Sequence, residues 1–226
     1  IMRPARRAPV GTDIIFKEGV LRATVTELLP DGGRLVRFTH PENRTIYDVL
    51  DEIGNMPLPP YITHRLEDKN RYQTVYAKTE GSAAAPTAGL HFTQDLLARI
   101  REKGVQIAPV MLHVGLGTFR PVKEKKLSDH VMHTEYFEVS QESADIINNR
   151  TGRLIAVGTT SCRTLESAAD ENGIIHPMAA DTGIFIYPGY RFRAVQGLIT
   201  NFHLPQSTLL MLVSAFSSRE IMLHAY

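Results

Sequence analysis

Residues 154–169, LIAVGTTSCRTLESAA, carry the pattern from which the fold class can be argued. Residues 154–157 are a short apolar run, typical of a buried strand, and Gly158 with two threonines follows at once. Residues 160–169 then have the composition of a helix. The flanking sequence repeats this alternation of strand and helix. It predicts an α/β layer with a mostly parallel or mixed sheet and flanking helices.

Apolar periodicity and capping residues predict the other elements around this stretch. Thr93 and Ser140 are placed to cap two helices that end near residues 103 and 148. The expected strands are residues 105–114, 133–139, 183–187 and 198–200, and an apolar helix is expected at 207–217.

The first part of the chain favours β-structure. Strand-like runs occupy residues 13–16, 20–28 and 34–39, with a turn signal at 31–33, and a helical apolar stripe at 45–53 ends at Gly54. The next residues, 56–60, read MPLPP, which excludes a helix or central strand because proline lacks the backbone donor. We therefore expect a boundary here, between a unit at 1–55 and a unit at 56–226.

The composition excludes several classes of protein. Of 226 residues, 43% are hydrophobic and 22% charged, as in a folded globule rather than a disordered chain. The single cysteine, Cys162, excludes an internal disulfide framework and a zinc site of several thiolates, and it fits a reducing compartment. The longest apolar run, residues 209–213, is too short to span a bilayer. A net charge of +1 limits any nucleic-acid contact to a local patch.

Two segments place glycines and hydroxyl residues directly after a strand. Residues 157–161 are followed by Arg163 and Glu166, and residues 113–119 contain His113 and a Gly115-x-Gly117 pair. Free N–H groups at such places suit a carboxylate or a phosphate. Two ordinary capped turns would give the same pattern, because short glycine motifs are common.

Histidines gather in three other segments. His133 and Glu135 would share one face of a strand, a pattern that favours the wall of an organic-ligand pocket over a metal site. His91 ends a run of small residues, and residues 201–205 combine an amide, an aromatic ring and an imidazole. Several such clusters in one α/β domain indicate a shared site. Cys162 is a possible nucleophile, but a lone cysteine inside a helix is more often a core residue.

Long blocks of the sequence are similar to a known family. They include SAAAPTAGLHF at 82–92, LHVGLGTFRPV at 112–122, HTE at 133–135 and TNFHLPQSTLLMLVSAF at 200–216. With these blocks the chain resembles the S-adenosylmethionine:tRNA ribosyltransferase-isomerases of queuosine biosynthesis. Members of that family extend beyond both ends of this sequence, so we expect it to be a fragment.

The resemblance implies a fold and an activity. Residues 1–55 would be the latter part of an inserted β-barrel and the return connection, and residues 56–226 most of the α/β catalytic domain. The enzyme would transfer and isomerise the ribosyl part of S-adenosylmethionine onto 7-aminomethyl-7-deazaguanine at the wobble position of a tRNA anticodon. Epoxyqueuosine, adenine and methionine would result. S-adenosylmethionine would be a co-substrate, with no other cofactor and no metal, in a cytoplasmic enzyme without membrane partners that we expect to be a monomer.

The matching motifs also imply site residues. The expected catalytic residues are Glu135, His133, His91, His113 and His203. The expected substrate-binding residues are Thr159, Thr160, Ser161, Arg163, Glu166, Gly115, Gly117, Thr118 and Asn201. The expected tRNA contacts are Arg3, Arg6, Arg7, Lys123, Lys125 and Lys126.

Two alternatives remain open at this point. A non-catalytic RNA-binding module would need no cluster of histidines and would release no adenine. An ordinary S-adenosylmethionine-dependent methyltransferase would release S-adenosylhomocysteine instead, and its usual glycine-rich motif is absent near the start of the sequence.

Overall fold

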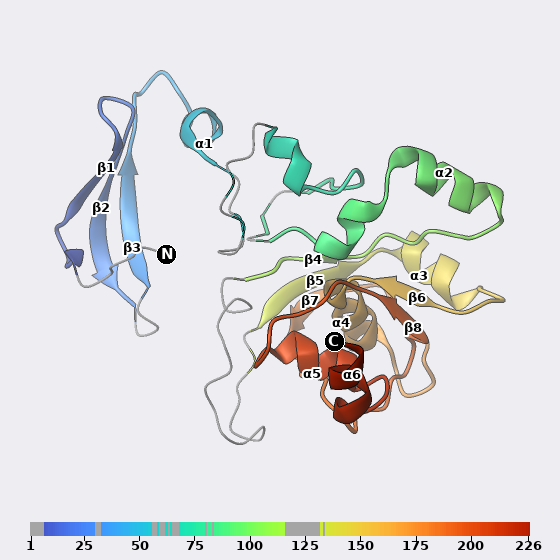
Figure 1. Cartoon of the computed structure of the whole chain (residues 1–226). Helices are drawn as coiled ribbons and strands as arrows, with labels where there is room; N and C mark the ends of the chain where they lie inside the picture. Colours follow the sequence, from blue (N-terminus) through green and yellow to red (C-terminus); the bar gives the residue numbers. More distant parts are fainter. Residues whose placement is uncertain are drawn as a thin grey trace. The chain divides into compact units, whose positions relative to one another are not determined.

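The computed structural model divides the chain into two compact units, Ile1–Met56 and Pro57–Tyr226 (Figure 1). The structure describes residues 7–29, 33–55, 58, 62, 64, 68–79, 81–82, 84–115, 132 and 134–226.

The first unit is a three-stranded antiparallel sheet with one helix. Its strands are β1 (Asp13–Lys17), β2 (Leu21–Leu28) and β3 (Arg34–Thr39), in the order β1-β2-β3. The helix α1 (Ile46–Ile53) follows, and of its residues Val49 is buried. All four elements confirm the sequence prediction within a residue, because alternation in β2 and the threonine cap of α1 are strong local signals. The described strands form an open sheet, and the barrel stays a prediction.

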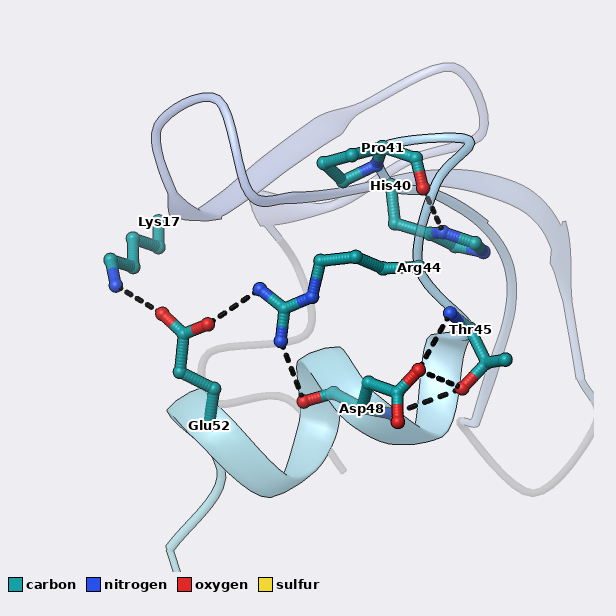
Figure 2. A network of polar contacts seen from close by, with 7 residues as sticks. All are labelled: Lys17, His40, Pro41, Arg44, Thr45, Asp48 and Glu52. Atoms are coloured by element: carbon teal, nitrogen blue, oxygen red, sulfur yellow. Dashed lines mark hydrogen bonds and ion pairs between the residues drawn. The ribbon is translucent and has the colours of Figure 1, made fainter.

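Polar contacts tie α1 to the sheet of this unit (Figure 2). The Glu52 carboxylate accepts hydrogen bonds from Lys17 Nζ at 2.6 Å and from Arg44 Nη1 at 2.5 Å. These two cations lower the pKa of Glu52 to about 2. At the start of α1, Thr45 and Asp48 form a capping box, in which each side chain accepts a hydrogen bond from the other residue's backbone N–H.

The second unit contains a mixed set of small sheets. β4 (Met111–Leu112), β5 (Glu135–Val139) and β7 (Met178–Thr182) form an antiparallel sheet in the order β4-β5-β7. β6 (Ile155–Val157) and β8 (Gly197–Ile199) form a separate parallel pair. The expected α/β class is confirmed, but the strands form small separate sheets, and each described sheet pairs only antiparallel or only parallel strands. An alternation of strands and helices does not specify which strands pair.

Two predicted strands of this unit need correction. The run at 105–114 contributes only the two residues of β4 to a sheet, and 183–187 forms no strand. The strand lies just before it, in β7, whose sequence MAADT is a weak strand former that pairs with β5. Ile186 is instead buried in the core without strand pairing. Tertiary packing here outweighs the β-propensity of 183–187.

Serine and threonine caps start most of the helices in the second unit. Thr93, Ser140 and Ser207 each accept a hydrogen bond from a backbone N–H of the first turn, as predicted for the first two. The helices are α2 (Gln94–Glu102), α3 (Gln141–Asn148), α4 (Thr159–Ala168), α5 (Thr208–Ser214) and α6 (Arg219–Ala225), with 3₁₀ turns at Lys69–Tyr72 and Thr87–His91. Helix α6 is not among the elements predicted from the sequence. No helix in the described ranges is both long and apolar enough to cross a bilayer.

Helix α4 lies at the centre of the core, against β4, β5, β6 and β7 (Figure 1). Its side chains Cys162, Leu165 and Ala168 are buried in one cluster with Phe137 and Val139 of β5. Burial raises the pKa of the Cys162 thiol to about 12. The cysteine is therefore a core residue rather than a nucleophile, since its reactive thiolate is not populated near neutral pH.

We expect Cys162 to resist alkylation in the folded protein. At pH 8, iodoacetamide should modify it at least about a hundredfold more slowly than in the same chain unfolded in urea. Burial lowers the fraction of reactive thiolate and also keeps the reagent away from the sulfur atom. Mass spectrometry of timed samples measures both rates. Equal rates would show that the thiol is exposed and reactive.

Candidate functional site

Predicted site residues meet where β6 and β8 end. Because the two strands are parallel, their carboxyl ends lie at the same edge, and Gly158 N donates to Ile199 O at 2.9 Å across this edge. Thr159 and Thr160 follow β6, and Asn201 follows β8 two residues after its end. In open α/β sheets this is the edge at which ligands bind.

The first turn of α4 presents backbone donors at this edge that are not capped by a side chain of Gly158. The helix begins after Gly158, which has φ +92° and no side chain to cap the turn. The N–H groups of residues 159–161 therefore have no partner within the helix. Ser161 Oγ donates to Val157 O at 2.9 Å, so its proton is already engaged. This turn suits a carboxylate or a phosphate, and the binding of either stays a prediction.

A buried ion pair lies one turn further along α4. Arg163 Nη1 donates to Glu135 Oε2, and the two side chains are only 5% and 2% exposed. The other carboxylate oxygen, Glu135 Oε1, accepts a hydrogen bond from Gly115 N at 2.9 Å. Three predicted residues, far apart in the sequence, are thus in direct contact.

Not all nitrogen atoms of the Arg163 guanidinium have a hydrogen-bond partner among the described residues. Its Nε and Nη2 are buried and have no hydrogen-bond partner in the part of the chain that the structure describes. A buried donor without a partner costs about 1–3 kcal/mol, and more when it belongs to a charged group. Arg163 can therefore form two further hydrogen bonds, and an anionic ligand is a suitable acceptor.

Residues of the segment at 81–91 lie close to the backbone before Gly115, to the start of α4 and to the loop after β8. Ser82 Oγ accepts a hydrogen bond from Val114 N at 3.1 Å, next to Gly115. Pro86 Cβ lies 4.0 Å from the position that a Cβ on Gly158 would take. At the end of the segment, His91 Nε2 is 3.2 Å from Asn201 Oδ1. The small residues predicted to allow close approach of backbones do so here.

Two glycines of this segment show how close that approach is. A Cβ on Gly89 would lie 1.9 Å from the Tyr76 hydroxyl, so any other residue at this position would require the Tyr76 side chain to move. A Cβ on Gly81 would lie 3.0 Å from the His113 ring, and that ring stacks on Tyr136 at 5.8 Å between centroids. The segment thus packs against both His113 and Tyr76.

His203 lies on the loop after β8, between two hydroxyl groups. Its Nε2 is 3.3 Å from Thr200 Oγ1 and its Nδ1 is 2.9 Å from the Tyr226 hydroxyl. Burial lowers the pKa of His203. The imidazole is therefore neutral at pH 7 and can accept a proton. Sequence reasoning missed Thr200 and Tyr226, since no local pattern shows that the last residue would meet this loop.

Glu166 lies on α4 three residues after Arg163, and its hydrogen-bond partners come from the loop before β8. Its carboxylate accepts four hydrogen bonds of 2.9–3.0 Å, from the Tyr190 hydroxyl and from the backbone N–H groups of Arg193, Ala194 and Val195. These fill its acceptor sites. Glu166 thus holds the loop before β8, and its expected contact with substrate stays a prediction.

A surface hollow lies near the carboxyl end of α4. It is lined by Glu171, Asn172, Phe185 and residues 187–193. Of the predicted catalytic residues that the structure describes, none lines it. Arg193 Nη1 donates from here to Ala169 O, at the end of α4 opposite Thr159.

Several predicted residues lie outside the described ranges. These are His133, Gly117, Thr118, Arg3, Arg6, Lys123, Lys125 and Lys126. Arg7 is described, and its side chain is exposed in the first unit. The roles of all these residues stay predictions.

Comparison with known proteins assigns the family. The model of the family described as queuosine biosynthesis protein matches residues 1–226. The S-adenosylmethionine:tRNA ribosyltransferase-isomerase of Lachnoclostridium phytofermentans is 58% identical over 229 residues, and that of Desulfitobacterium hafniense is 55% identical over 229 residues. A crystal structure of S-adenosylmethionine tRNA ribosyltransferase from Thermotoga maritima is 31% identical, with a TM-score of 0.47.

These similarities cover this chain almost completely, but only part of the proteins compared. The matches span 100% of this chain but 62% and 67% of the two relatives. For the Thermotoga maritima structure the shares are 99% of this chain and 61% of that one.

Proposed function

Because the chain belongs to the queuosine biosynthesis protein family, we propose that it transfers and isomerises the ribosyl part of S-adenosylmethionine onto a tRNA base. The acceptor is 7-aminomethyl-7-deazaguanine at the wobble position of the anticodon. The products are epoxyqueuosine, adenine and methionine. The family resemblance also implies that the sheet of the first unit belongs to a β-barrel, which stays a prediction.

The buried Arg163 is the observation that best supports this function. S-adenosylmethionine carries a carboxylate at the end of its methionine part, and two donors of Arg163 have no partner in the described ranges. The free N–H groups of the first turn of α4 lie one helical turn away. Arg163 and this turn together would hold the methionine carboxylate, or a tRNA phosphate, which binds to the same donors.

Glu135 acts in this proposal as the residue that orients Arg163. Both of its oxygens already accept hydrogen bonds, from Arg163 and from Gly115. A carboxylate so engaged is a poor candidate for removing a proton from the substrate. It fixes the orientation of the guanidinium and therefore of its remaining N–H donors. The negative charge of Glu135 would also stabilise the positively charged sulfonium of a bound substrate.

The proposed reaction needs proton transfers that histidines can supply. The sulfonium acidifies the carbon beside it, adenine leaves more easily when its nitrogen is protonated, and the attacking amine must be neutral. His203 is neutral at pH 7 because burial lowers its pKa, so we assign it the role of a proton acceptor. His91, paired with Asn201, and His113 are the remaining described candidates.

The test is to identify the products. Purified protein, S-adenosylmethionine and a tRNA carrying 7-aminomethyl-7-deazaguanine should yield adenine and methionine in equal amounts, measured by mass spectrometry. The same tRNA with unmodified guanine at the wobble position is the control and should yield neither.

Two results would contradict the proposal. Release of S-adenosylhomocysteine would identify a methyltransferase. Binding of the tRNA without any adenine release would favour a non-catalytic RNA-binding module.

A further inference from the structure

An aromatic side chain on the loop after β8 is exposed to water. Phe202 is 78% exposed, the highest fraction among the large apolar side chains in the described ranges, and Leu204 is 65% exposed. An exposed aromatic ring gains free energy when a flat apolar surface covers it. The residues around Phe202 show that it is held in place for such a contact.

The Phe202 ring is fixed by the end of α6. It packs edge to face on Tyr226, with 4.9 Å between centroids. The Tyr226 hydroxyl accepts a hydrogen bond from His203 N at 3.2 Å and lies 2.9 Å from His203 Nδ1. A ring held in this way loses little conformational entropy when a ligand stacks on it.

The same loop contains backbone strain. Gln206 has φ +57°, the only positive φ of a residue other than glycine in the described ranges. Such strain persists only where the surroundings enforce it, and it is concentrated at functional sites.

The exposed ring is also next to the candidate site. Phe202 follows Asn201, whose side chain contacts His91. Asn201 donates no hydrogen bond from its amide within the described part of the chain. An aromatic face and an amide that can bind the edge of a base are thus adjacent in the sequence.

Resting on the proposed function, we propose that Phe202 stacks on an unpaired nucleobase of the RNA substrate. Small-molecule sites bury most of their ligand, whereas this ring is open to solvent, so a base of a large substrate fits better than the adenine of S-adenosylmethionine. Unpaired bases of RNA loops bind proteins by stacking on aromatic side chains.

The chain has no tryptophan, which allows a direct test of stacking. A Phe202→Trp variant carries one indole, and a base stacked on it should quench its fluorescence. Titration with an anticodon stem-loop should quench at least half of the emission. The matched control is Tyr47→Trp, at a residue 74% exposed on α1, and its emission should not change.

Kinetics give a second, independent measurement. The Phe202→Leu variant should raise the KM for the RNA by roughly ten- to a hundredfold, the loss expected for one stacked base. In this variant the KM for S-adenosylmethionine and kcat should stay within about twofold of the original values. The Phe202→Tyr variant should keep the original KM for the RNA, because tyrosine retains the aromatic face.

Three outcomes would overturn the stacking proposal. Quenching by S-adenosylmethionine alone, with a raised KM for it, would show that the ring contacts adenine. Blue-shifted emission that no ligand changes would show that a segment of the protein covers the ring. Normal adenine release with an unchanged KM for RNA in Phe202→Leu would refute stacking and leave the proposed function intact. Conversely, quenching by the stem-loop without adenine release would support stacking and refute the proposed function.

Discussion

The Glu166→Leu variant is expected to lose about 5 kcal/mol or more of unfolding free energy, a large share of the stability of an ordinary domain. Glu166 is 1% exposed, and its carboxylate receives the Tyr190 hydroxyl and three consecutive backbone N–H groups, those of residues 193–195. Leucine accepts no hydrogen bond, so all four donors lose their partner, and two of them, the N–H groups of Ala194 and Val195, belong to buried residues. Urea unfolding, followed by circular dichroism, measures the loss.

A graded series separates this structural role from a role in substrate binding. Glu166→Gln keeps one oxygen but turns an amide toward a backbone donor, so we expect a smaller loss of about 2–3 kcal/mol. Glu171→Gln, at an exposed glutamate near the end of α4, is the matched control and should change stability by less than about 0.5 kcal/mol. Unchanged stability in Glu166→Gln with a raised KM for S-adenosylmethionine would support the original prediction that Glu166 binds substrate.

Local signals account for the elements that the sequence predicted well. The caps Thr45, Thr93 and Ser140 start helices because their side chains bond the first-turn N–H groups, which depends on neighbours only. The alternating burial of β5, with Glu135 and Phe137 on the inner face, likewise follows from a period of two. The strand β7 was missed because its position depends on pairing with β5, which local propensity does not encode.

Some contacts of the candidate site could likewise be predicted from the sequence, and others could not. Grouping Thr159 with Asn201 required only that residues after parallel strands meet at one edge. His91 lies in the 3₁₀ turn before α2, so its contact with Asn201 does not follow from this rule. The role of Glu166 could not be predicted, because its partners lie 24–29 residues away on a loop with no repeating pattern. The contact of Tyr226 with His203, 23 residues apart, is equally invisible in the sequence. Direct contacts between distant irregular segments depend on the final packing.

Replacing Arg163 by methionine should abolish most of the proposed activity and also destabilise the fold. The change leaves Glu135 buried without its cation, which costs about 3–5 kcal/mol. It also removes two charge-assisted hydrogen bonds to the anionic substrate, together worth about 3 kcal/mol or more, so kcat/KM for adenine release should fall at least about a hundredfold. Because the single variant changes both properties, its low activity alone does not assign a role to Arg163.

The double variant Glu135→Gln, Arg163→Met separates the two effects. It removes both buried charges, and glutamine keeps an acceptor for Gly115 N, so unfolding free energy should return to within about 2 kcal/mol of the original protein. The donors of Arg163 stay absent, so adenine release should remain at least about a hundredfold reduced, with a raised KM for S-adenosylmethionine. A double variant that regains both stability and activity would show that the ion pair serves only the fold, because a structural pair can be replaced by neutral groups whereas a ligand-binding guanidinium cannot.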